Sequence, residues 1–421
     1  MPPRPRLSRS FATAAVVLAT ACGAATVDVP PPELPAASVG ATAPMASVAS
    51  LAAPADAAVE PEPETPPEID LGAAAASQPA SACSAPSLNL AEQDDVWNTP
   101  SQQVATYRCQ LAGRGADLAR LLEGALPLDV GTAAHVARIF EAGSALGRRA
   151  NVFGLVGDSM TLSGHFLRPF AASNRSARVP AEVEDAFALD APSGDARTVL
   201  DLFRGPSITD APSGAGRSDS FIAPRAAKVG ARVTWALAPR GPNEANPIDD
   251  LVRTLSPAYA VILYGANDAV WGVEPPDVLA GRFEDALSRV VAMLEARGVV
   301  PVLTTVPRHM HEWGWPDRAP TPEGVSNERF AVQATALSAA VAHLACARRL
   351  PLIDLRWSLE PLLNHGVGPD GVHLSVHPAG GGVLDPSGLE CGYNVRNLVT
   401  LRELALIVGA ASSEVGASDV W

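Results

Sequence analysis

Residues 151–160 read Asn-Val-Phe-Gly-Leu-Val-Gly-Asp-Ser-Met, a short apolar run that ends in a glycine, an aspartate and a serine. The run Val152–Val156 predicts a buried strand, because a continuous apolar segment of this length has no polar face to turn to water. A serine directly after a strand lies at its carboxyl end, where the N-terminus of a following helix favours developing negative charge. The stretch therefore predicts a strand of a sheet with the hydroxyl of Ser159 at its edge.

Further apolar runs along the chain predict four more strands, at 233–237, 258–264, 299–305 and 352–355. Apolar positions at helical spacing predict helices around them, at 101–148, 278–297, 327–349 and 395–409. Continuous apolar strands that alternate with helices imply a mostly parallel sheet covered on both faces. The predicted fold class is therefore α/β, with a helical lead-in at 87–150 and a catalytic domain at 151–412.

A long insertion, 171–224, separates the first two predicted strands. It contains Asp-Ala-Pro-Ser-Gly twice, at 190–194 and 210–214, a composition typical of turns. An insertion after the first strand lies at the edge of the sheet where ligands bind in such folds. Two interpretations stay open, that it shapes a substrate cleft or that it has no part in one.

Two further motifs follow predicted strands. Gly265-Ala266-Asn267-Asp268 comes after the third strand, and an asparagine amide can donate to an oxyanion without adding charge, although a turn or helix cap is the alternative. Asp370-Gly371-Val372-His373 comes after the fifth, and a carboxylate near an imidazole fixes its tautomer when it takes a proton from a serine. Because the carboxyl ends of parallel strands share one edge, the motifs predict one site.

In order and placement, these motifs resemble the first, third and fifth blocks of the SGNH, or GDSL-type, hydrolases, over about residues 151–410. The resemblance implies a flavodoxin-like three-layer α/β/α sandwich with five parallel strands, and hydrolysis of carboxylic esters without a cofactor. It also implies that Ser159 is the nucleophile, His373 the general base and Asp370 the residue that orients it. Asn267 and the backbone N–H of Ser159 are the implied oxyanion donors.

The family's second block supplies a glycine whose N–H completes the oxyanion hole, in the loop after the second strand. Gly241 is the only glycine in the loop that follows the predicted strand 233–237, so it is assigned this role. The cluster His309-Met310-His311-Glu312 lacks a recognisable zinc arrangement, and no metal is predicted. Two histidines and three tryptophans near the predicted site are open to two interpretations, as substrate contacts or as structural residues. They are His365, His377, Trp271, Trp313 and Trp315.

The N-terminus predicts export. Three arginines precede the apolar run Phe11–Ala21, which is too short to span a bilayer and is typical of a signal peptide, predicted at 1–21. Cys22 follows a sequence that resembles the lipobox of bacterial lipoproteins, which predicts a lipid anchor in a membrane. Cleavage near Ala21 to give a soluble exported protein is the alternative. Residues 22–86, rich in Ala, Pro and Glu, predict a disordered tether.

The charge and the cysteines agree with an exported protein. A net charge of −14 argues against nucleic acid as a partner, because little here would neutralise phosphates. Besides Cys22 there are four cysteines, and an even number in an exported chain predicts disulfides. Sequence proximity suggests the pairs Cys83–Cys109 and Cys346–Cys391.

These observations predict an extracytoplasmic serine esterase that acts on a lipid, glycan or small-molecule ester. Two alternatives remain. An O-acyltransferase would use the same serine and histidine, with a glycan hydroxyl in place of water. A tethered binding protein would have lost catalysis altogether. The sequence does not separate hydrolysis from transfer, since they differ only in which nucleophile reaches the acyl-enzyme.

Overall fold

The computed structural model describes residues 109–415, apart from 110, 112, 114, 175, 191–195, 206–207, 209–218, 224, 240, 242–243, 310–326 and 369. The predicted signal peptide at 1–21 and the predicted tether at 22–86, with Cys22 and Cys83, lie outside these residues. The first part of the predicted lead-in, 87–108, also lies outside them.

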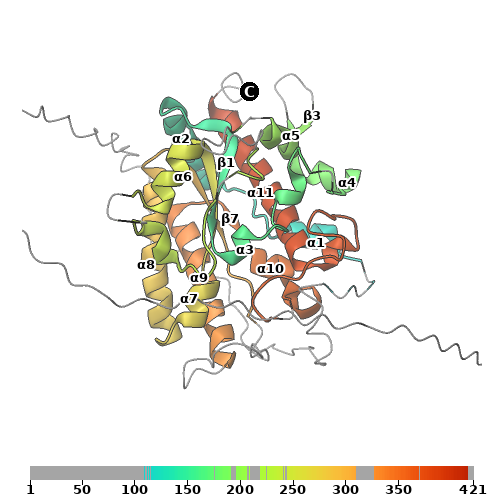
Figure 1. Cartoon of the computed structure of the whole chain (residues 1–421). Helices are drawn as coiled ribbons and strands as arrows, with labels where there is room; N and C mark the ends of the chain where they lie inside the picture. Colours follow the sequence, from blue (N-terminus) through green and yellow to red (C-terminus); the bar gives the residue numbers. More distant parts are fainter. Residues whose placement is uncertain are drawn as a thin grey trace, which may run out of the picture. The chain divides into compact units, whose positions relative to one another are not determined.

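A five-stranded parallel sheet forms the centre of the fold (Figure 1). Its order is β4 (Ala226–Ala227), β1 (Arg149–Gly157), β5 (Pro257–Leu263), β6 (Val300–Thr304) and β7 (Leu352–Ile353). Every residue of β5 and β6 is buried, as expected for strands covered on both faces. The predicted α/β class with a mostly parallel five-stranded sheet is therefore confirmed.

Helices cover both faces of this sheet. On one face, α6 (Pro247–Leu255), α8 (Pro276–Glu295) and α9 (Asn327–Arg348) share a core with Val152 and Val156 of β1. On the other, α2 (Val130–Ala145) and α11 (Gly392–Val415) share a core with Phe153 and Leu155. The alternation of neighbouring β1 residues between the two cores follows from the period of a strand. Figure 1 shows α8 and α9 on one side of the sheet and α11 on the other.

Within the described part of the chain, one helical segment, Arg329–Arg348 of α9, is long and apolar enough to cross a membrane. It is 61% buried inside the protein, and it packs along α8. Its apolar character is therefore that of a core helix.

The second predicted strand is wrong. Val233–Leu237 forms a 3-10 helix, η6, and the edge of the sheet is instead Ala226–Ala227, which pairs with Val156 and Gly157. Both carboxylate oxygens of Asp268 accept a hydrogen bond from the Val233 N–H, at 3.3 and 3.2 Å, and so cap the start of η6. Its buried residues, Val233 and Ala236, are three apart, which is the period of a 3-10 turn.

The insertion contributes to the core rather than lying outside it. Phe203 contacts Phe153 of β1 edge to face, with ring centroids 4.9 Å apart, and Phe187 and Val199 are fully buried. Its described elements are α4 (Ala181–Glu184), η5 (Asp185–Phe187), the antiparallel pair β2 (Ala188–Asp190) and β3 (Ala196–Thr198), and α5 (Val199–Arg204), while η4 (Arg168–Phe170) directly precedes it. The remaining elements are α1 (Leu118–Leu122), α3 (Ser159–Leu162), α7 (Ala266–Trp271), α10 (Leu355–Leu359), η7 (Leu363–Gly366) and η8 (Gly388–Glu390).

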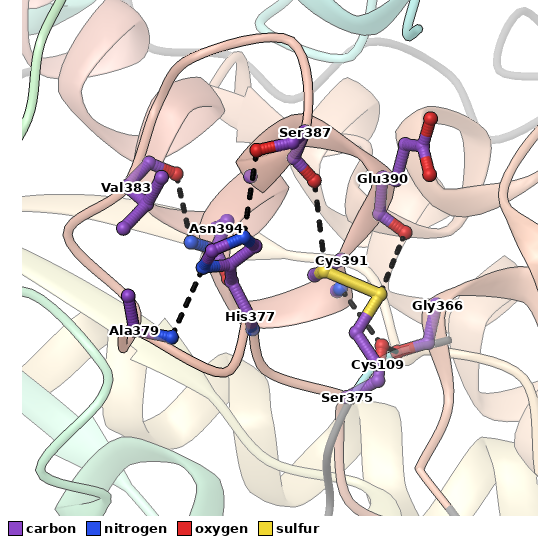
Figure 2. The surroundings of a disulfide bond; sticks show 12 residues. Cys109, Gly366, Ser375, His377, Ala379, Val383, Ser387, Glu390, Cys391 and Asn394 are labelled. Atoms are coloured by element: carbon purple, nitrogen blue, oxygen red, sulfur yellow. Dashed lines mark hydrogen bonds between the residues drawn. A yellow bond between two sulfur atoms is a disulfide. The ribbon is translucent and has the colours of Figure 1, made fainter. Parts of the chain in front are cut away.

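The predicted disulfide pairs are also wrong. Cys109 is bonded to Cys391, 282 residues away, with the two Cα atoms 5.5 Å apart (Figure 2). Cys346, which is also disulfide-bonded, therefore does not pair with Cys391. The helical lead-in also contacts the segment just before α11: the backbone N–H groups of Gly113 and Gly115 donate to the Glu390 carboxylate at 3.0 and 2.9 Å. Proximity in sequence is no guide to this pairing.

Candidate active site

Ser159 begins a helix of a single turn at the end of β1. The Asp158 side chain caps this helix, α3, by accepting a hydrogen bond from the Met160 N–H at 2.9 Å. Asp158 is fully buried, whereas Ser159 is partly exposed. The Ser159 Oγ lies 2.8 Å from the Nε2 of His373, which is 214 residues further along the chain.

A carboxylate holds the other side of the His373 ring. The Nδ1 of His373 lies 2.5 Å from the Oδ2 of Asp370, while Asp370 Oδ1 accepts the backbone N–H groups of Val372 and His373 at 3.0 and 2.8 Å. Gly371 makes the turn between them with a φ of +71°. Burial raises the pKa of Asp370, but its hydrogen bond with His373 and the charge of that ring outweigh burial, and the net shift is downward. Asp370 is therefore an ionised partner for the imidazole.

The loop that carries His373 is fastened to the start of α11. The Ser375 N–H donates to the Gly366 carbonyl at 2.8 Å, and the Ser375 carbonyl accepts the Tyr393 N–H at 2.8 Å. The Ser375 Oγ also accepts the Gly392 N–H at 3.1 Å. Figure 2 shows Ser375 and Gly366 beside Cys109 and Cys391, so the disulfide lies next to this loop.

Asn267 joins the same site from the end of β5. Its Nδ2 donates to Asp158 Oδ2 at 3.2 Å, which brings the first and third motifs together. The preceding Gly265 has a φ of +123°, and a Cβ there would lie 2.5 Å from Val306, so only glycine fits. Burial raises the pKa of Asp158 to about 6, although the Met160 N–H, Arg396 and Asn267 all favour its ionised form.

The next residue, Asp268, has a different task. It is buried, and its carboxylate is occupied by the Val233 N–H at the start of η6. Burial raises its pKa to about 7. Within the Asn-Asp pair, therefore, Asn267 faces the site and Asp268 stabilises the fold.

The assignment of Gly241 depended on the strand that the structure does not contain. Gly241 lies beyond η6, where its carbonyl accepts the Glu244 N–H at 3.1 Å. The loop that does follow the second strand of the sheet starts at Lys228, whose N–H donates to the Gly157 carbonyl at 3.2 Å, two residues before Ser159. This loop contains Gly230, with a φ of +74° and open space where a Cβ would stand. The two-residue strand before it has no periodic pattern from which the sequence could reveal it.

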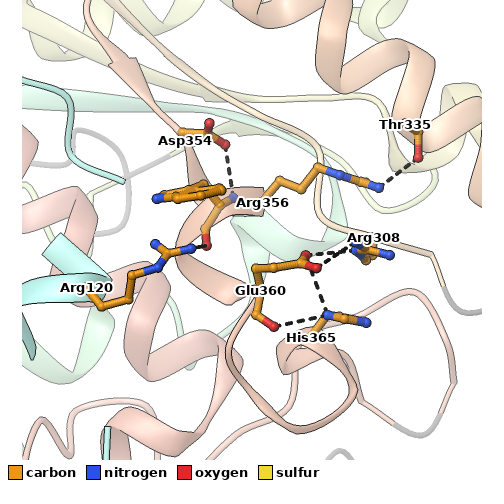
Figure 3. A network of polar contacts seen from close by, with 8 residues as sticks. Arg120, Arg308, Thr335, Asp354, Arg356, Glu360 and His365 are labelled. Carbon is orange, nitrogen blue, oxygen red and sulfur yellow. Dashed lines mark hydrogen bonds and ion pairs between the residues drawn. The ribbon is translucent and has the colours of Figure 1, made fainter. Parts of the chain in front are cut away.

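Three of the remaining histidines have distinct surroundings. His309 is buried, and neither ring nitrogen has a hydrogen-bond partner among the described residues. Burial lowers its pKa to about 4, helped by the charges of Arg356 and His373. The Nδ1 of His365 lies 3.3 Å from the carbonyl oxygen of Glu360, and the carboxylate of Glu360 also binds the guanidinium of Arg308 (Figure 3). His377 accepts the Ala379 N–H (Figure 2), so His365 and His377 both have structural partners.

The other residues with open interpretations are placed only in part. Trp271 is 49% exposed, whereas Trp313, Trp315, His311 and Glu312 lie outside the described residues. Over the part of the chain that the structure describes, no group of three His, Cys, Asp or Glu side chains has the arrangement to hold a metal ion.

The chain is thus an α/β protein in which hydrogen bonds join Ser159, His373 and Asp370 at one edge of a parallel sheet. The sequence model of the GDSL-like Lipase/Acylhydrolase family matches residues 203–379. That range contains Asn267, Asp370 and His373, whereas Ser159 precedes it. The resemblance to GDSL-type hydrolases is therefore confirmed, and it is carried in sequence by the later motifs.

Solved structures of low sequence identity also align with the chain. A lipase/acylhydrolase from Enterococcus faecalis has 15% identity and a TM-score of 0.34, over 60% of this chain and 94% of that one. A GDSL-like lipase from Bacteroides thetaiotaomicron VPI-5482 has 16% identity and a TM-score of 0.33, over 65% and 98%. A peptidoglycan O-acetylesterase has 16% identity and a TM-score of 0.26, over 45% of each chain. No curated protein matches the sequence.

Proposed function

We propose that this protein is a serine esterase that hydrolyses carboxylic esters through an acyl-enzyme on Ser159. The observation that supports this most directly is the hydrogen-bonded chain from Ser159 Oγ to His373 Nε2, at 2.8 Å, and from His373 Nδ1 to Asp370 Oδ2, at 2.5 Å. This arrangement matches the requirement of a nucleophile, a base and a group that orients the base.

The reaction proceeds in two halves. Ser159 Oγ attacks the ester carbonyl while His373 Nε2 takes the hydroxyl proton, and a tetrahedral intermediate forms. His373 then gives that proton to the leaving alcohol as the ester C–O bond breaks, which leaves an acyl-enzyme. Water attacks the acyl-enzyme, His373 takes its proton, and the carboxylic acid leaves as the proton returns to Ser159. Asp370 keeps the proton on Nδ1, so that Nε2 is free to accept.

The oxyanion of each intermediate needs donors that are already in place. We assign the backbone N–H of Ser159 and the Nδ2 of Asn267, which the carboxylate of Asp158 holds beside α3. Gly230 replaces Gly241 as the third donor, because its loop follows β4 and begins with a hydrogen bond to Gly157.

Export and tethering are part of the same proposal. The Cys109–Cys391 disulfide favours an oxidising compartment, in agreement with a signal peptide at 1–21. Lipidation of Cys22 would then hold the protein at a membrane, with residues 22–86 as a spacer.

The test compares the purified protein with Ser159→Ala on p-nitrophenyl acetate, butyrate and octanoate. Ser163→Ala is the matched control, because it removes a hydroxyl four residues away that accepts the backbone N–H of His165. We expect Ser159→Ala to abolish release of p-nitrophenol and Ser163→Ala to retain it. Equal activity in Ser159→Ala and the wild type would refute the proposal. A fluorophosphonate adduct on Ser159 without ester hydrolysis would instead favour acyl transfer.

A further inference from the structure

The helix that presents Ser159 is too short to satisfy its own backbone. Because α3 ends at Leu162, the carbonyls of Met160 and Thr161 have no further turn of helix to donate to them. Helix carbonyls point toward the C-terminal end, and therefore away from the Ser159 N–H. Whatever donates to them fixes the orientation of the whole turn.

Arg396 of α11 supplies the first set of donors. Its side chain is 1% exposed, and it donates from Nη1 to the Met160 carbonyl at 2.9 Å and from Nη2 to Thr161 Oγ1 at 3.3 Å. The guanidinium also stacks on the ring of Phe166, 3.5 Å from its centroid. Three contacts therefore hold Arg396, two from the turn that carries Ser159 and one from Phe166 in the segment that follows it.

Arg225, just before β4, supplies the second set. Its Nη1 donates to the Thr161 carbonyl and, at 3.4 Å, to the Ser163 carbonyl, while its Nη2 donates to the Phe166 carbonyl at 3.0 Å. Two guanidinium groups, one from the middle of the chain and one near its C-terminus, thus bind the same short segment, 160–166.

Among the described residues, neither guanidinium is ion-paired, and their acceptors are carbonyl and hydroxyl oxygens. Asp158 is at the opposite end of α3, where it caps the Met160 N–H. Positive charge at the C-terminal end of a helix is favourable, because the carbonyls there have no partner within the helix.

We propose that Arg396 and Arg225 are positioning residues for the nucleophile, holding α3 so that the Oγ and N–H of Ser159 keep their places relative to His373 and the ester. The proposal rests on the esterase function above. Neither arginine touches the substrate, and each acts through the carbonyls of the turn.

The experiment measures kcat and KM for p-nitrophenyl acetate, and the rate of inactivation by a fluorophosphonate, in Arg396→Met and Arg396→Lys. Arg402→Met is the matched control: Arg402 lies on the same helix and donates to the Ala186 carbonyl at 2.6 Å, but it does not contact α3. Assays are run well below the melting temperature of each variant, so that only folded protein is compared.

We expect Arg396→Met to lower kcat and the inactivation rate roughly 10- to 100-fold with KM nearly unchanged, because misplacement acts on the transition state. Arg396→Lys keeps the charge but offers one nitrogen in place of the planar guanidinium, and we expect it to recover part of the loss. If Arg396→Met does not fold, Arg396→Lys decides the matter by the same split between kcat and KM. Wild-type kcat in the folded Arg396 variants, or an equal loss in Arg402→Met, would overturn this proposal. Inactive wild-type protein would count against the esterase function itself.

Discussion

Asn267 donates its side-chain amide to the Oδ2 of Asp158, and the same carboxylate accepts the Met160 N–H through Oδ1. One buried side chain therefore sets the position of two proposed oxyanion donors, Asn267 and the first turn of α3. In the sequence Asp158 is only the middle of a motif. The structure makes it the link between motifs that lie 109 residues apart.

Replacing Asn267 by alanine tests its role as an oxyanion donor. We expect kcat to fall by roughly 10²–10³, the usual cost of losing one such donor. The free energy of unfolding should fall by only about 1–3 kcal/mol, the cost of leaving the buried Oδ2 of Asp158 without this donor, so the variant should stay folded. Steady-state kinetics and circular dichroism check the two expectations. The exposed amide of Asn174, which donates to the Arg168 carbonyl, is the control as Asn174→Ala. Near-normal turnover in Asn267→Ala would remove the residue from the role.

Replacing Asp370 by asparagine tests the orientation of the base. The asparagine Oδ1 can still accept the N–H groups of Val372 and His373, so the turn should survive. Its amide, however, would donate to His373 Nδ1 and place the ring proton on Nε2, facing Ser159. We expect kcat to fall by on the order of 10⁴ with little loss of stability. A modest effect on kcat would mean that His373 keeps its tautomer without Asp370.

The sequence predicts the placement of the three motifs well because each follows a strand with a continuous apolar run. Ser159, Asn267 and His373 follow β1, β5 and β7, and the parallel sheet brings these strand ends to one edge. The strand before Gly230 escapes prediction because its two alanines stand between Arg225 and Lys228 and form no longer apolar run. Val233–Leu237 misleads for a related reason, since a five-residue apolar run fits a strand as well as a 3-10 helix.

The long-range contacts escape prediction for another reason. Nothing local to Arg396 or Arg225 marks them as partners of α3, because their acceptors are backbone carbonyls that every residue has. The Cys109–Cys391 pair likewise depends on how the lead-in returns to α11, which only the folded chain defines. Patterns in sequence predict elements, whereas contacts between distant elements come from packing.

The Cys109–Cys391 disulfide provides a direct test of the contact between the helical lead-in and the start of α11. Non-reducing peptide mapping should recover one species that contains Cys109 and Cys391, and a peptide joining Cys346 to Cys391 would contradict the structure. The double variant Cys109→Ser/Cys391→Ser should have a free energy of unfolding about 2–5 kcal/mol lower than wild type, and should therefore unfold at a lower denaturant concentration. The reason is that a bond closing so long a loop strongly restricts the unfolded chain. Urea melts of wild type and variant, both without reductant, provide the comparison.

The last prediction concerns pH and the buried carboxyl of Asp268. Burial raises its pKa to about 7 in the folded protein, above the ordinary value near 4 that it takes when unfolded. Between these values the folded state binds a proton that the unfolded state does not, so the free energy of unfolding falls as pH rises from about 4 to 7. Asp268→Asn keeps an acceptor for the Val233 N–H and removes the charge. We expect the free energy of unfolding of Asp268→Asn, relative to that of wild type, to rise by on the order of a few kcal/mol as the pH increases from 5 to 8.

Urea melts at the two pH values measure this difference, with Asp277→Asn as the control, because Asp277 is an exposed carboxylate in the first turn of α8. The sign is the decisive feature: the curves of wild type and Asp268→Asn should diverge as pH rises, while wild type and Asp277→Asn should stay parallel. Burial raises the pKa of Asp158 to about 6, so this carboxyl adds to the slope of all three proteins. Because its charge also raises the pKa of Asp268, the size of the difference depends on both carboxyls, whereas its sign does not. A relative stability of Asp268→Asn that is the same at both pH values would mean that Asp268 is ionised throughout, compensated by the nearby charge of Arg232.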